Sequence, residues 1–217
     1  MKMFKFSYLI LKKELLHEWA TRERALTMGL FGFISAVVFH FTIFVDESLV
    51  SHLATGGLWV VFFFSATLGL GRIFIAEKED SAMDALLVSP ISAEAIYLGK
   101  TAAIFLLTLF VQLWIWLVFS VLFRLPQGNI FRQFTALFLA TLGICAIGTL
   151  VAAISVHARK REMLFPILFF PLALPFLMLG ASAWAGAECV RYIQMLFACD
   201  IIAIASGFIL FEYAASE

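Results

Sequence analysis

Six apolar stretches of about 20 residues each constrain this chain more than any other feature, because a helix needs that length to cross the hydrocarbon core of a bilayer. Hydrophobic residues make up 63% of the sequence and charged residues 14%, against about 45–50% and 25% in soluble domains. We therefore predict an all-α integral membrane protein. The predicted spanning helices are residues 26–45, 53–75, 101–123, 133–156, 164–184 and 192–212.

The segments between these spans are too short to form a second core, so we expect residues 1–217 to form a single transmembrane domain. Positive charge indicates how this domain is oriented, since Lys and Arg concentrate in cytoplasmic loops. With a cytoplasmic N-terminus, only Arg124, Arg132 and Arg191 lie outside. We predict that both termini and residues 76–100 are cytoplasmic. Nothing in the distribution of charge indicates nucleic-acid binding.

Residues 1–24 precede the first span and carry apolar residues at helical spacing. A side with Lys13 and His17 lies opposite this apolar side. This pattern predicts a helix that lies in the membrane interface; the alternative is a disordered basic tail. The apolar residues are Phe4, Tyr8, Leu11, Leu15 and Trp19.

The longest polar segment, Arg72 to Thr101, separates the second span from the third. Ser81 and Asp84 have the spacing of a helix capping box, and Pro90 cannot continue a helix. We predict a short amphipathic helix at 81–89. Because so short a helix is marginal alone in water, it needs lipid or a partner protein to dock against. In the simplest alternative it only links two spans.

Two stretches of the sequence form a pattern that extends beyond helix signals. Residues 158–181 are a basic loop that leads into a span with prolines. The first stretch contains Arg72, Phe74, Glu77, Asp80, Met83, Asp84, Leu86, Pro90 and Lys100. Together they resemble the heme exporter protein B family, the membrane subunit of the cytochrome c maturation ABC transporter. Ser81 stands where that family usually has Gly.

The resemblance implies an ABC-2-type permease subunit in the bacterial inner membrane, present as two copies with two copies of a separate ATPase subunit. Further implied partners are heme-handling membrane subunits and a heme chaperone, which is released in its loaded form when ATP is hydrolysed. Segment 81–89 would be the coupling helix that contacts the ATPase. The implied ATPase-coupling residues are Glu77, Asp80, Ser81, Met83, Asp84, Leu86, Leu87 and Pro90.

No cofactor, metal or catalytic residue is predicted in the chain itself, so ATP is used by the partner and heme is handled by the complex. Gly99, Lys100 and Thr101 spell the end of a phosphate-binding loop, yet Glu94 occupies the position where that motif needs Gly. We interpret Lys100 instead as a charge that extends from the third span to the interface. His40 and His52 are isolated and are not expected to bind heme.

Two polar residues, Arg72 and Asp200, are assigned to the membrane-embedded part. Asp200 lies near the middle of the sixth span, and Ala203 and Gly207 share its side of the helix, where a neighbouring helix can approach closely. One interpretation is a relay or coupling acid. The other is a neutral acid with a structural hydrogen bond to another span.

The remaining features concern helix packing. Gly148 and Ala152 lie one turn apart and predict close helix packing of the fourth span. The fifth span holds Pro166, Pro171 and Pro175, which predict interruption or kinking.

Two other functions stay open: an ABC-2 permease for a lipid or small molecule, and a membrane scaffold without an ATPase. An intramembrane enzyme is disfavoured, because no catalytic set can be assembled from facing spans.

Overall fold

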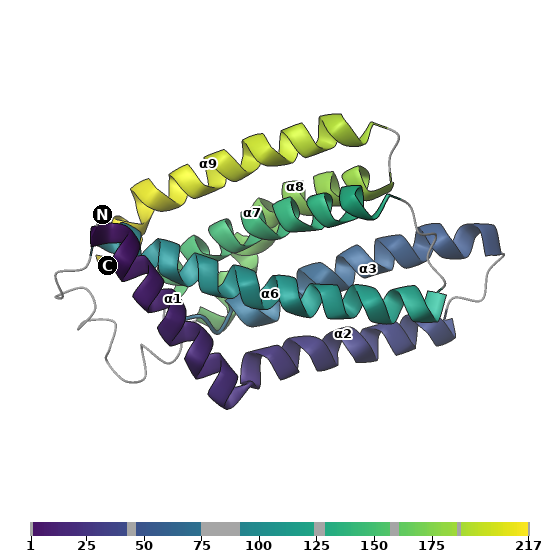
Figure 1. The fold of residues 1–217 in the computed structure, drawn as a ribbon, viewed down its shortest axis with the longest axis horizontal. Helices are drawn as coiled ribbons and strands as arrows, with labels where there is room; N and C mark the ends of the chain where they lie inside the picture. Colours follow the sequence, from purple (N-terminus) through teal and green to yellow (C-terminus); the bar gives the residue numbers. More distant parts are fainter. Residues whose placement is uncertain are drawn as a thin grey trace.

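The computed structural model describes residues 2–42, 47–74, 92–123, 129–156, 161–185 and 188–216. Nearly all of these residues are helical, and they contain no strand (Figure 1). The helices are α1 (Lys2–Thr21), α2 (Glu23–Thr42), α3 (Glu47–Leu70), α6 (Ala93–Phe123), α7 (Ile130–Val156), α8 (Arg161–Ala185) and α9 (Cys189–Ser216).

Six of these helices, α2, α3 and α6 to α9, are long and apolar enough to cross a membrane. This confirms the predicted all-α fold with six spans. Helix α6 begins at Ala93, ahead of the predicted span at residues 101–123, as expected if Ser92 caps a helix that runs through Lys100 into the third span. Hydropathy marks only the part of a helix that suits hydrocarbon, and the more polar first turns of α6 are helical as well.

Helix α7 lies at the centre of the bundle and packs mainly against α8 and α9. A small residue also lets α3 approach α7: a Cβ atom built on Gly148 would lie 2.5 Å from Cδ1 of Leu70 on α3. Ala152, one turn later, is buried. The predicted close packing at this pair is therefore confirmed.

Helix α8 contains all three of its prolines in its interior and is continuous from Arg161 to Ala185. The predicted interruption is therefore not observed. Spanning helices tolerate proline where neighbouring groups satisfy the backbone that it frees.

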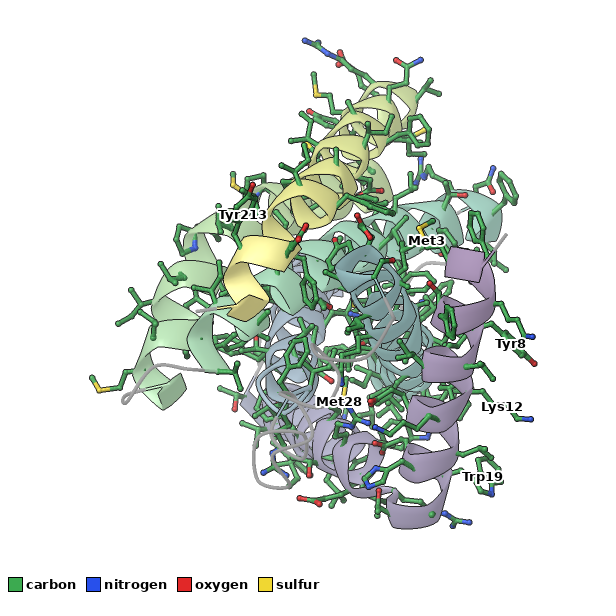
Figure 2. All side chains as sticks on the ribbon, turned by 90° about the vertical axis from the view of Figure 1, so that its left-hand side faces the viewer. Met3, Tyr8, Lys12, Trp19, Met28 and Tyr213 are labelled. Carbon is green, nitrogen blue, oxygen red and sulfur yellow. The ribbon has the colours of Figure 1, made fainter. Side chains whose placement is uncertain are left out.

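Helix α1 crosses one end of the bundle, the end at which both termini lie (Figure 1). It packs chiefly against α6. Tyr8, Lys12 and Trp19 point away from the bundle (Figure 2), and Trp19 is 76% exposed. An aromatic and basic outer face suits a helix in the membrane interface, and that position stays a prediction for residues 1–24.

A tight turn joins α1 to α2. Thr21 ends α1, Glu23 begins α2, and Arg22 between them has a φ angle of 55°. The Arg22 N–H donates a hydrogen bond to the carbonyl of Glu18 at 2.6 Å. A residue in the left-handed region is a common way to end a helix, and here it redirects the chain from the crossing helix into the first span.

Candidate functional site

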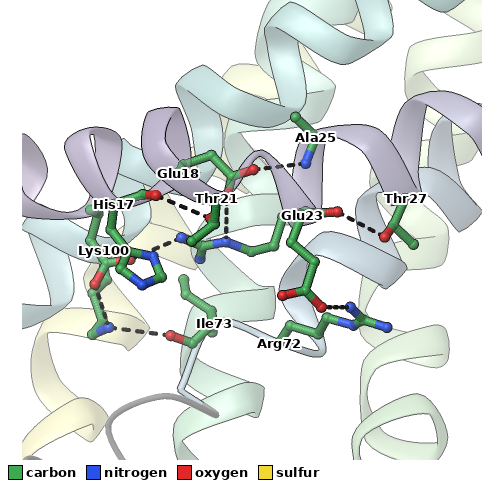
Figure 3. A network of polar contacts seen from close by, with 11 residues as sticks. His17, Glu18, Thr21, Glu23, Ala25, Thr27, Arg72, Ile73 and Lys100 are labelled. Atoms are coloured by element: carbon green, nitrogen blue, oxygen red, sulfur yellow. Dashed lines mark hydrogen bonds and ion pairs between the residues drawn. The ribbon is translucent and has the colours of Figure 1, made fainter.

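A cluster of buried charged side chains lies where α1, the start of α2, the end of α3 and the start of α6 meet (Figure 3). Glu14 and Glu18 come from α1, Arg24 from α2 and Lys100 from α6. All four side chains are at most 14% exposed. We call these four residues the charge cluster.

Lys100 is the most buried member of the charge cluster, with a relative exposure of 1%. Its Nζ donates to Oε1 of Glu14 at 3.0 Å and to the carbonyl of Ile73 at 3.2 Å. It also lies 4.7 Å from the ring centroid of Phe74. The interpretation of Lys100 as an anchor that reaches the interface is therefore wrong, because buried partners hold its ammonium group inside the bundle.

Arg24 binds both carboxylates of α1. Its Nε donates to Oε2 of Glu18 at 2.8 Å, and its Nη2 donates to Oε2 of Glu14 at 3.2 Å. Glu14 thus bridges Arg24 and Lys100. The formal charges of the four residues sum to zero, which is the condition under which a low-dielectric interior tolerates ions.

Glu18 also stabilises the start of α2. Its Oε1 accepts the backbone N–H of Ala25 at 2.9 Å. The first N–H groups of a helix have no partner within the helix, and a carboxylate there satisfies one of them and interacts favourably with the helix dipole. The cluster therefore fixes the angle between α1 and α2.

The spacing of α1 explains why its carboxylates point inward. Ile10, Glu14 and Glu18 follow one another at intervals of four, so they share one face of the helix, and all three are buried. Tyr8 and Trp19 lie on the exposed part of α1. The exposed face of α1 thus carries aromatic residues, whereas its buried face carries the carboxylates of Glu14 and Glu18.

A small cavity of about 10 Å³ lies among the side chains of the charge cluster. This is about the space that one water molecule needs, and a buried water requires two or more polar partners. Carboxylate and ammonium groups line the cavity. An ordered water at this position would extend the hydrogen bonds of the cluster.

Arg72 lies in the turn that follows α3, beside the charge cluster. Its Nη1 donates to Oε1 of Glu23 at 2.7 Å, and the two side chains are 43% and 71% exposed. An exposed ion pair of this kind contributes at most about 1 kcal/mol. Within the bundle, Arg72 is a surface residue rather than a buried one.

The eight predicted ATPase-coupling residues, Glu77 to Pro90, lie outside the described residues. The structure does describe the two points that flank them, which are Phe74 and Ser92. The charge cluster lies next to the first of these, since Lys100 contacts Ile73 and Phe74.

Asp200 is 2% exposed and lies on α9 against α7 and α8. A Cβ built on Gly143 of α7 would overlap both its Oδ1 and the ring of Phe176 on α8. Neither carboxyl oxygen has a hydrogen-bond partner in the described part of the chain. The hydrogen bond that the structural interpretation expects is therefore not present there.

Potential metal and heme ligands are scattered. Within the described residues no three His, Cys, Asp or Glu side chains form a group that could hold a metal ion. His40 is exposed and lies against the rings of Phe41 and Phe123. The three cysteines are free thiols, and Cys145 is buried.

Sequence reasoning missed the charge cluster as a unit. A signal was present, because Glu14 and Glu18 are one helical turn apart on the side of α1 away from its aromatic residues. Nothing in the sequence, however, gives the pairing of Glu14 with Lys100, which are 86 positions apart.

Comparison with known proteins gives one consistent result. The family described as CcmB protein matches residues 5–216. Heme exporter protein B from Rhodobacter capsulatus is 32% identical over 141 residues, covering 64% of this chain and 65% of the relative. The protein of that name from Paracoccus denitrificans is 30% identical, covering 74% of this chain and 75% of the relative. The one from Pseudomonas aeruginosa is 26% identical, covering 82% and 79%. The chain thus spans just under two thirds of the first relative and about three quarters or more of the other two.

Proposed function

Because the chain belongs to the CcmB protein family, we propose that it is the membrane subunit of an ABC transporter for heme export and cytochrome c maturation. Its curated relatives carry the name heme exporter protein B. The observation that carries the proposal is the match over residues 5–216, which includes all six spanning helices and the segment between α3 and α6. The protein would work in the bacterial inner membrane.

The energy for this work would come from a separate ATPase subunit. Six spanning helices and α1 account for most of the 217 residues, and the remaining segments are too short for a nucleotide-binding domain. We propose that two copies of the chain pair with two copies of the ATPase.

Contact with the ATPase would be made by residues 81–89. The proposal rests on the sequence of this segment, which has a capping box, an apolar face with Leu86 and Leu87, and a terminating Pro90. Phe74, the last described residue before the segment, lies against the ammonium group of Lys100, so a displacement of the segment would act on the charge cluster.

Heme would be handled by the complex as a whole. We propose that heme-handling membrane subunits and a heme chaperone are partners, and that ATP hydrolysis drives release of the loaded chaperone on the outer side. The role of this chain is then mechanical: it transmits a conformational change from the ATPase to the membrane-embedded helices.

The proposal is tested in a strain from which the protein has been deleted, by supplying either the unaltered chain or a variant with residues 81–89 replaced by a Gly-Ser linker of equal length. The expected result is loss of the ATPase from the purified complex and loss of mature cytochrome c. Glu188→Gln is a control, because Glu188 is 65% exposed and, among the described residues, its carboxylate pairs with the nearby Arg191. Undiminished recovery of the ATPase would contradict the coupling role. Normal maturation would favour a permease for another substrate.

A further inference from the structure

Both acidic residues of α1 are turned into the bundle. The sequence of this helix contains two carboxylates, those of Glu14 and Glu18. Both side chains are buried, and the cations that bind them in the charge cluster are Arg24 and Lys100. The exposed surface of α1 therefore carries no acidic side chain.

The exposed side of α1 combines basic and aromatic residues. Four exposed residues, separated by three, four and seven positions, share one face of the helix; they are Lys5, Tyr8, Lys12 and Trp19. We call these four residues the basic face. Arg22, just beyond α1, adds a guanidinium that lies 5.6 Å from the centroid of the Trp19 ring. The basic face thus joins positive charge to apolar ring surface.

The basic face points sideways out of the bundle. The spanning helices run along the longest axis of the molecule (Figure 1), and Figure 2 looks down that axis. In this view Tyr8, Lys12 and Trp19 extend sideways, away from the other helices. Since spanning helices run close to the bilayer normal, this sideways direction lies along the plane of the membrane. The side chains therefore face whatever surrounds the bundle in that plane.

The level of α1 along the bundle agrees with a position at the membrane surface. Helix α1 touches α6 at Gly99, where a built Cβ would lie 2.7 Å from Cβ of Ile10. The first exposed large apolar residue of α6 is Leu106, and Phe110 follows one turn later. At 1.5 Å per residue, the contact at Gly99 is about 10 Å from this exposed apolar surface. A headgroup layer is about 5–8 Å thick, so α1 lies at the level of the headgroups.

We propose that the basic face binds anionic phospholipids of the leaflet at this end of the bundle. The ammonium groups of Lys5 and Lys12 attract the negative headgroups, and the rings of Tyr8 and Trp19 take the interfacial position that aromatic side chains favour. The inference goes beyond an interfacial helix, which requires no charge on the lipid. It also goes beyond the proposed function, since it involves neither heme nor nucleotide.

The charge cluster contributes to this binding. By pairing Glu14 and Glu18 inside the bundle, it keeps two negative charges off a face that meets negative headgroups. Lipid also fits the face better than a protein partner does. Lysine is depleted in the cores of protein interfaces, whereas lysine on a helix with aromatic residues is typical of binding to anionic membranes.

The test measures which lipid touches α1 in the full chain, reconstituted into vesicles of phosphatidylcholine and phosphatidylglycerol in equal parts. A fluorophore is attached to a cysteine at position 9, because Leu9 is 49% exposed and lies within one turn of Lys5 and Lys12. One of the two lipids carries bromine on its acyl chains near the glycerol. Bromine quenches the fluorophore only at short range, so the two preparations report the relative occupancy of the two lipids.

The native cysteines do not interfere with this labelling. Cys189 and Cys199 are replaced by Ala, and Cys145 is buried. A second fluorophore position is 202 on α9, because Ile202 is 69% exposed within a spanning helix. This position reports lipid contact away from α1.

The decisive variant combines Lys5→Gln and Lys12→Gln, which remove two charges from the basic face and keep long polar side chains. Both lysines are exposed, so the variant is expected to fold. Arg191→Gln is the matched control. Arg191 is 67% exposed and lies in the first turn of α9, at the end of the bundle opposite the two termini (Figure 1).

We expect phosphatidylglycerol to be favoured at position 9 by about fivefold or more, since one basic residue near an anionic surface contributes about that factor. The ratio should fall toward one in the double lysine variant and at high salt, which screens exposed charges. It should stay unchanged in Arg191→Gln. At position 202 the two lipids should quench equally.

Four results would overturn the inference. Equal quenching by the two lipids at position 9 would show that α1 lies in lipid without selecting its charge. No quenching there, with normal quenching at position 202, would show that the basic face meets water or protein. An unchanged ratio in the double lysine variant would assign the preference to other residues. Loss of quenching when the ATPase is bound would assign the face to that subunit. The first three results leave the proposed function as it is, because co-purification of the ATPase tests that separately.

Discussion

The ring of Tyr97 fills the space that a side chain at position 207 would occupy. Tyr97 belongs to α6 and Gly207 to α9, and a Cβ built on Gly207 would overlap Cζ and Oη of the tyrosine. The Tyr97 hydroxyl also donates to the carbonyl of Ala146 on α7 at 3.2 Å. One aromatic side chain thus holds three spanning helices together, and the missing side chain at position 207 makes this possible.

We expect Gly207→Ala to destabilise the protein by about 1–3 kcal/mol, the usual cost of adding atoms to a packed interior. Thermal unfolding in detergent is the measurement. Gly56→Ala is the matched control, because Gly56 is also in a spanning helix and a Cβ there would meet nothing within 4 Å. Equal unfolding temperatures for the two variants would contradict the close contact.

The sequence was sufficient to predict this contact in outline. Gly207 and Ala203 share one side of the sixth span, and small residues let helices approach. Six spans also follow from the length of the apolar stretches. Both features are local, since each depends on residues within one helix.

Lys100 illustrates what could not be predicted. A lysine near the end of an apolar stretch has the same sequence pattern whether its ammonium group reaches water or a buried carboxylate. The choice depends on Glu14, which is 86 positions away and is brought close only by packing of α1 on α6. The buried face of α1, with Glu14 and Glu18, was not predicted either. The aromatic residues of α1 gave the stronger helical pattern, and that pattern indicated only the apolar side of the helix.

The buried pair of Glu14 and Lys100 should show strong coupling in stability. Removing one partner of a buried ion pair leaves the other charge uncompensated and typically costs about 3–5 kcal/mol. We expect Glu14→Gln and Lys100→Met each to destabilise the protein. The double variant should lose clearly less than the sum of the two.

A double-mutant cycle on unfolding in detergent measures this coupling. The exposed pair of Glu188 and Arg191 provides the control cycle, and its coupling should not exceed about 1 kcal/mol. Additive effects of Glu14→Gln and Lys100→Met would show that the two charges do not depend on each other.

Asp200 allows a different kind of prediction, since its carboxyl oxygens have no hydrogen-bond partner in the described part of the chain. Leucine branches at the same carbon as aspartate but is larger and carries no polar atom, and replacing an unsatisfied polar group by an apolar one can be neutral or stabilising. We expect Asp200→Leu to unfold at the same temperature as the unaltered protein or higher.

Maturation of cytochrome c in Asp200→Leu and Asp200→Asn then separates the two interpretations of this residue. Loss of maturation in stable variants would assign the acid a role in relay or coupling. Full activity of Asp200→Asn would leave only a structural role. A marked drop in the unfolding temperature of Asp200→Leu would contradict the absence of a polar partner.

The turn between α1 and α2 gives the last prediction. Arg22 has a φ angle of 55°, a conformation that costs residues other than glycine roughly 1–2 kcal/mol. Arg22→Gly removes this cost. It also removes the contact of the guanidinium with the Trp19 ring at 5.6 Å, which is worth about 0.5–1 kcal/mol at an exposed site. We expect Arg22→Gly to be neutral or slightly stabilising.

Arg22→Val should destabilise the protein, because a β-branched residue is strained in this region of φ and ψ. Circular dichroism during heating measures both, and greater stability of the valine variant would contradict the left-handed turn.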